Sequence, residues 1–195
     1  MRLFQTLPLA ALVVLLGHPG GTPSTIPRML GPLRLGMSLT ALKALHAGLD
    51  VSCTDECAVG EAQASLTFGA LPGVLSALTA LGYDSSRVAA TEGFDCTFYR
   101  GRLASLSLPS PSSSADSAAK ILTAQLGPWD AGTLGSAVAL LHWRAPQTEL
   151  VLVLAPPAGP GLPDLRHAQA TRLELLDRPL AAALDRARAR RRPVH

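Results

Sequence analysis

Apolar residues recur at helical spacing in four stretches of the chain, and this pattern predicts four helices. Ser38 and Asp177 precede two of the stretches and are good N-cap residues, while Gly82 and Gly127-Pro128 follow the last apolar position of two others. The predicted helices span residues 38–49, 73–81, 112–126 and 177–187.

Alternation of apolar and polar residues predicts strands between these helices. The clearest pattern is a hairpin over Phe94–Tyr99 and Leu103–Leu108, with Arg100-Gly101 as its tight turn. A second hairpin is expected over residues 136–143 and 149–154. Single strands are expected over Ala64–Phe68 and Thr171–Leu176.

This order of elements favours an α+β fold: one antiparallel sheet with two to three helices packed on one face. A chain of 195 residues suits one domain of ordinary size or two very small ones. We therefore expect a single α+β domain over residues 34–192. Because a helix followed by a hairpin occurs twice, two halves, 34–110 and 111–192, are the alternative.

The first residues predict export. Arg2 precedes a ten-residue apolar run, Leu7–Leu16, which is shorter than the roughly 20 residues that span a membrane. We expect a signal peptide over residues 1–21 and a linker rich in Pro, Gly and Thr over residues 22–33. An uncleaved anchor and a buried helix are the alternatives. The expected location is periplasmic or secreted.

Cys53, Cys57 and Cys96 are disulfide candidates in an oxidising compartment. A local Cys53–Cys57 bridge is slightly favoured over a bridge from Cys96 to either of them. Cys96 alternates with Phe94 and Phe98, so we expect it to face the core, where a thiol acts as a small hydrophobe. A zinc site with a histidine is a weaker alternative, because C-x₃-C is not a strong zinc spacing. We predict no metal and no cofactor.

Two segments carry a family resemblance. Leu33–Leu45, LRLGMSLTALKAL, resembles the opening of small envelope domains of the SmpA/OmlA outer-membrane assembly lipoprotein type and of the β-lactamase-inhibitor-protein type. The hairpin Asp95–Leu108, DCTFYRGRLASLSL, is similar to the strand-turn-strand that follows in those domains. The resemblance implies a scaffold that binds proteins through an exposed sheet face, and it carries over no catalytic residue.

Charge adds one feature to this picture. The formal net charge is only +3, but the chain ends in an arginine-rich segment made of Arg186, Arg188, Arg190, Arg191 and Arg192. We interpret this tail first as a solvated, fraying helix end; the alternative is contact with anionic lipid headgroups or nucleic acid by electrostatics. It lacks interleaved aromatics for stacking on bases, so we expect no nucleic-acid partner. Membrane contact is expected only through this tail or an uncleaved N-terminus.

No catalytic set is convincing, so we interpret the chain as a binding or interaction module of the cell envelope whose partner is another envelope or secreted protein. The expected contact residues are exposed positions: Tyr99, Arg100, Arg102 and Trp129. The alternative is a small hydrolase or cell-wall enzyme, because Ser117 and Lys120 match the S-x-x-K pattern of penicillin-binding enzymes. The companion S-D-N and K-T-G elements are absent from the sequence.

Overall fold

The computed structural model describes residues 26–46, 48, 51–53, 60–84, 88, 93–134, 138–155 and 164–191. The expected signal peptide, residues 1–21, lies outside the described residues. Within the described ranges, no helix combines the length and the apolar character needed to cross a bilayer.

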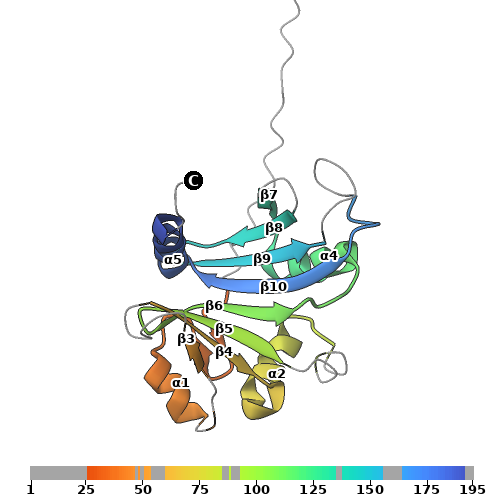
Figure 1. Ribbon diagram of the computed structural model, residues 1–195. Coiled ribbons are helices and arrows are strands. Elements are labelled where there is room, and N and C mark those ends of the chain that lie inside the picture. Colours follow the sequence, from red (N-terminus) through yellow and green to blue (C-terminus); the bar gives the residue numbers. More distant parts are fainter. Residues whose placement is uncertain are drawn as a thin grey trace, which may run out of the picture.

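An eight-stranded antiparallel sheet forms the centre of the molecule (Figure 1). Its order, β3-β4-β5-β6-β10-β9-β8-β7, makes two four-stranded meanders that meet where β6 pairs with β10. The strands are β3 (Val51–Cys53), β4 (Glu61–Leu66), β5 (Phe94–Tyr99), β6 (Arg102–Pro109), β7 (Asp130–Leu134), β8 (Val138–Arg144), β9 (Thr148–Leu154) and β10 (Ala170–Asp177). The predicted α+β fold with an antiparallel sheet is confirmed.

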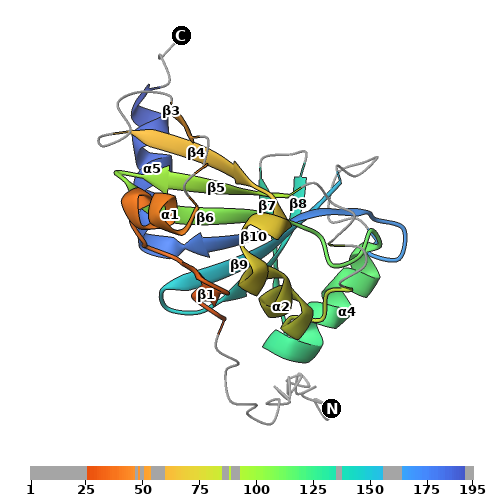
Figure 2. The same cartoon turned by 90° about the horizontal axis from the view of Figure 1, so that it is seen from below.

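Helices cover both faces of this sheet. Three of them, α1 (Leu39–Leu45), α2 (Pro72–Ala80) and α4 (Ala115–Leu126), contribute side chains to the main core on one face. The last helix, α5 (Arg178–Arg191), packs its apolar residues against a separate small cluster. In Figure 2 the strands lie between the viewer and α5, while α1 and α2 lie in front of the sheet. The C-terminal helix therefore uses the face that the other helices leave open.

Capping residues lie at most of the predicted helix ends, and one helix is shorter than predicted. The Oγ of Ser38 accepts a hydrogen bond from the Ala41 N–H at 3.1 Å, and the Oγ of Ser114 accepts one from Ser117 N–H. Gly127 follows α4 with a φ of 82°, a left-handed conformation that favours glycine. Helix α1 ends at Leu45, before the expected stop near residue 49.

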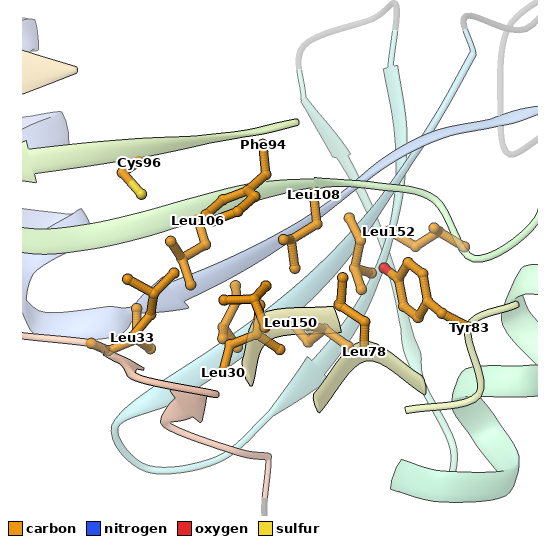
Figure 3. Close-up of a cluster of buried hydrophobic side chains, with 14 of the residues drawn as sticks. Leu30, Leu33, Leu78, Tyr83, Phe94, Cys96, Leu106, Leu108, Leu150 and Leu152 are labelled. Atoms are coloured by element: carbon orange, nitrogen blue, oxygen red, sulfur yellow. The ribbon is translucent and has the colours of Figure 1, made fainter. Parts of the chain in front are cut away.

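The main core is built mostly from leucine (Figure 3). Leu30 and Leu33 enter it from the N-terminal segment, Leu78 from α2, and Leu106 and Leu150 from the sheet; none of these five side chains is more than 1% exposed. Residues of both meanders belong to the same buried cluster. Burial of this continuous apolar surface holds the two meanders together.

The N-terminal segment differs from the predicted linker. Residues 26–33 include β1 (Met29–Leu30) and the first residue of β2 (Leu33–Arg34), which pair as a small antiparallel sheet. Gly31 turns this hairpin with a φ of 59°, and a Cβ there would come within 2.4 Å of the Gly73 backbone. This segment is part of the packed core because its apolar side chains meet α2.

The hairpin of β5 and β6 has the predicted turn. Arg100 and Gly101 both have positive φ, 49° and 67°, as a two-residue turn between twisted strands requires. A bulge then follows, because the register moves from Thr97 opposite Ser105 to Phe98 opposite Leu103. The extra residue, Ala104, is fully buried on the α5 face of the sheet.

Cys96 is a free, fully buried thiol in β5. Burial raises the pKa of this thiol to about 12, so it stays protonated and unreactive at neutral pH. The alternative bridge from Cys96 to Cys53 is wrong. β4 lies between β3 and β5, so the backbones of these two strands are about 9.6 Å apart by strand spacing alone. Disulfides need Cα atoms within about 7 Å. Cys57 lies outside the described residues, so the local pair stays a prediction.

Candidate anion-binding groove

The N-terminus of α5 is fixed by one buried carboxylate. Oδ1 of Asp177 accepts a hydrogen bond from the Leu180 N–H at 3.2 Å, which is the predicted N-cap. Oδ2 of Asp177 accepts from Nη2 of Arg28 at 2.6 Å, and this ion pair ties the N-terminal segment to the helix. The Asp177 side chain is only 6% exposed. Helix α5 therefore leaves β10 in a defined direction.

An apolar stripe made of Leu180, Leu184 and Ala187 then holds α5 on the sheet. Leu184 is buried against Tyr99 at the end of β5 and Ala104 at the bulge of β6. The expectation that Tyr99 is exposed is wrong: the side chain is 8% exposed, because α5 covers it.

An ion pair fixes α5 over β4 of the first meander. Arg188 donates from two guanidinium nitrogens to the carboxylate of Glu61 in β4. The Glu61 carboxylate raises the pKa of this guanidinium above its usual value. The Glu61 side chain is 15% exposed and that of Arg188 is 47% exposed. Charge and packing together hold the arginine-rich helix in place.

A hollow of about 230 Å³ lies between α5 and the β5–β6 turn. We call it the arginine groove, and its walls are Tyr99, Arg100, Ala183, Arg186, Ala187 and Arg190. The guanidinium of Arg100 lies over the Tyr99 ring, 5.4 Å from its centre, in a cation–π contact. Three cationic side chains from two separate elements therefore share one small opening.

The three groove arginines form no ion pair with any described residue. Within the described part of the chain, Arg100, Arg186 and Arg190 contact no carboxylate, whereas Arg28 and Arg188 each do. Arg186 and Arg190 are one helical turn apart, a spacing at which like charges destabilise a helix by a few tenths of a kcal/mol. Positive charge is concentrated here at a small cost in stability.

The backbone conformation of Arg100 is a second unfavourable feature of the groove. Arg100 is the only described non-glycine residue with positive φ. Such turn positions prefer Asn or Gly, because a Cβ in the left-handed region costs roughly 1–2 kcal/mol. Backbone strain of this kind tends to occur at functional sites. Arg100 thus puts a long cationic side chain at a turn position where the backbone conformation favours a small residue.

The other two predicted contact residues, Arg102 and Trp129, do not line the arginine groove. Arg102 is exposed, but its Nη1 donates to the carbonyl oxygen of Gly36 at 3.1 Å. Trp129 precedes β7, four strand positions from β6, which is about 19 Å across the sheet. Trp129 is half-buried against the main core. Of the four, only Tyr99 and Arg100 line the groove, although Arg102 is the cross-strand partner of Tyr99.

Arg186 and Arg190 were predicted only as part of the basic tail that can contact anionic lipid, and not as part of the protein-contact surface with Tyr99 and Arg100. Their spacing of four residues puts them on one face of the helix, and this signal is present in the sequence. Their position beside Arg100 could not be predicted from the sequence, because it depends on which face of the sheet α5 covers.

The hydrolase candidate gains no support from geometry. Ser117 and Lys120 are exposed on α4, and Lys120 donates to Asp116 at 2.7 Å. His142 is a partnered histidine, with its Nδ1 2.6 Å from Oε1 of Glu149. In the part of the chain that the structure describes, no three potential ligands gather as a metal site would require.

A larger hollow of about 450 Å³ lies at the other end of β4, β5, β6 and β10. Its charged residues are already satisfied: Ser65 donates to Asp95 at 2.6 Å, and Arg172 pairs with Glu174 at 2.7 Å. The arginine groove differs because its charges have no such partners among the described residues.

No protein-family model, curated protein or solved structure matches this chain. The resemblance to the SmpA/OmlA and β-lactamase-inhibitor-protein types therefore stays a prediction. The candidate site depends on the geometry of the arginine groove alone.

Proposed function

We propose that this protein is an exported binding module that holds a negatively charged partner in the arginine groove. One observation carries the proposal: Arg100, Arg186 and Arg190 line a single hollow without a carboxylate partner among the described residues. Guanidinium groups remain protonated at any physiological pH, so the groove keeps its charge in every exported compartment.

The composition of the groove favours binding over catalysis. Among the described residues, its walls carry guanidinium, methyl and phenol groups and hold no carboxylate, imidazole or thiol. General acid–base catalysis most often uses histidine, and otherwise a carboxylate, lysine, cysteine or tyrosine. The one such group among the described lining residues, the Tyr99 phenol, belongs to a residue that is only 8% exposed. The groove is therefore suited to hold charge rather than to transfer protons.

The expected export defines the partner as an envelope or secreted macromolecule. The resemblance implies protein binding through an exposed sheet face, and the arginine groove opens on the α5 face of the sheet. We infer that a partner with an acidic or otherwise anionic surface approaches this face. Complementary charge would accelerate its association and orient it.

A charge-reversal experiment tests the proposal. The chain from residue 22 is cross-linked to envelope and culture fractions, and captured macromolecules are quantified for the wild type and for Arg186→Glu/Arg190→Glu. The matched control is Arg34→Glu/Lys43→Glu, which changes the net charge equally at two exposed positions outside the groove. Capture should persist in the control and be lost in the groove variant. Equal capture by all three proteins would contradict the proposal.

A further inference from the structure

We infer that the group recognised in the arginine groove is a phosphate group. The inference rests on the proposed function, because it names the chemistry of the anion that the same groove holds. It assigns Arg100, Arg186 and Arg190 as the residues that contact the phosphate oxygens.

The number of guanidiniums favours phosphate over a carboxylate. A single carboxylate carries one negative charge and two oxygens, and one arginine fork can occupy both of them. A phosphate monoester carries a charge of about −1.5 to −2 and three acceptor oxygens. Three arginines line the groove. A phosphate, with its higher charge and three acceptor oxygens, can therefore bind all three, whereas a single carboxylate cannot.

The residue type supports the same choice. All three cations of the groove are arginine, and neither lysine of the chain contributes to it. The planar guanidinium binds phosphate through two parallel hydrogen bonds, whereas an ammonium acts as a point charge. The Tyr99 ring supports the Arg100 guanidinium and limits its movement, so less conformational entropy is lost on binding.

The size of the groove suits a single group. Its volume of about 230 Å³ is below the roughly 300–1,000 Å³ of pockets that enclose a drug-sized ligand. A phosphate group fits as the end of a larger molecule that remains outside the groove.

A bilayer surface alone explains this arrangement less well. Helix α5 uses its apolar stripe against the sheet, so that stripe is not available to enter a membrane. The exposed large apolar residues among the described ones, Met29 and Leu45, belong to β1 and α1. Attraction to a charged bilayer then adds only about fivefold in affinity per basic residue. A phosphate seated in the groove makes direct hydrogen bonds in addition.

Titration with inorganic phosphate tests the inference. Side-chain Nε–H resonances of arginine are followed by NMR on the chain from residue 22, at constant ionic strength, and succinate serves as the dicarboxylate comparison. Phosphate should shift the resonances of Arg100, Arg186 and Arg190 and bind more tightly than succinate. Arg186→Ala/Arg190→Ala should weaken phosphate binding by about tenfold or more, since it removes charge-assisted hydrogen bonds. Arg34→Ala/Lys43→Ala should leave it unchanged.

Vesicles that contain phosphatidylglycerol identify the source of the phosphate. Vesicle binding that free phosphate competes away would support a lipid headgroup as the natural ligand. Phosphate binding without vesicle binding would support a soluble or polymer-borne phosphate. Vesicle binding that free phosphate leaves unchanged would overturn the inference, because the attachment would be to the charged surface alone.

The inference and the proposed function fail separately. Succinate binding as tight as phosphate binding, lost in Arg186→Ala/Arg190→Ala, would overturn the inference and leave the proposed function standing. If neither anion shifts the groove resonances and Arg186→Glu/Arg190→Glu captures as much as the wild type, both are contradicted.

Discussion

Arg188 and Arg190 are two residues apart on the same helix, yet they have opposite environments. Arg188 extends over β4 and pairs with Glu61, whereas Arg190 lines the groove beside Arg186 without a carboxylate partner among the described residues. The difference arises because Arg188 lies over Glu61 of β4, whereas Arg190 lies in the groove with Tyr99 and Arg100. Arg188 therefore attaches the helix to the sheet, whereas Arg190 presents a charge that no described carboxylate neutralises.

Helix α5 as a whole carries both kinds of residue, those that anchor it and those that line the groove. Its anchoring contacts are the Asp177 cap, the ion pair with Arg28, the buried Leu184 and the Arg188–Glu61 pair. The groove residues on the same helix add like-charge repulsion instead. Proteins commonly accept reduced stability where a site has a function. We therefore expect substitutions in the two regions to separate stability from binding.

The largest effect is expected from Leu184→Ala. This side chain is 5% exposed and is the buried leucine of the small α5 cluster. Its truncation should lower the free energy of unfolding by about 2–4 kcal/mol, because it leaves a cavity between α5 and the sheet. Urea denaturation measures this change. A loss below about 0.5 kcal/mol would show that α5 contributes little to the folded state.

A smaller loss is expected from Asp177→Ala, about 2–3 kcal/mol in urea denaturation. The substitution removes the N-cap of α5 and leaves Arg28 without its carboxylate. Asp177→Asn is the matched variant, because Asn keeps the capping oxygen and loses only the ion pair. It should therefore lose less than Asp177→Ala. Equal losses in the two variants would show that the cap contributes nothing.

The smallest loss in the anchoring region is expected from Glu61→Gln. It should cost no more than about 1 kcal/mol in denaturant unfolding, because the Arg188 side chain is 47% exposed and surface ion pairs are weak. The difference from wild type should shrink at about 1 M salt, where charges are screened within a few ångströms. A loss of stability that does not depend on salt would show that Glu61 stabilises the fold through packing and not through its charge.

Local signals predicted much of this fold. Ser38 and Asp177 cap helices where the sequence places them, and Arg100-Gly101 forms the expected turn. Short strands escaped prediction: β3 has three residues, and β7 contains Gly132 within five residues, so neither shows a full alternating pattern.

The arginine groove was only half predictable. Tyr99 and Arg100 were expected at a contact surface, but the burial of Tyr99 depends on a helix more than 80 residues further along the chain. The bulge at Ala104 provides the small residue against which α5 packs, and no local pattern marks it. Long-range packing therefore determined which arginines meet.

The most direct test of the account measures stability and binding together. The free energy of unfolding of wild type, Arg186→Ala/Arg190→Ala and Arg34→Ala/Lys43→Ala is compared with and without phosphate or succinate at constant ionic strength. Without anion, the groove variant should match wild type within about 0.5 kcal/mol or exceed it slightly, since like-charge repulsion is removed. At least one anion should stabilise wild type and the control more than the groove variant, because ligand binds the folded state. Equal stabilisation of all three proteins by both anions, or a loss above about 1 kcal/mol in the groove variant without anion, would contradict the claim that these arginines serve binding.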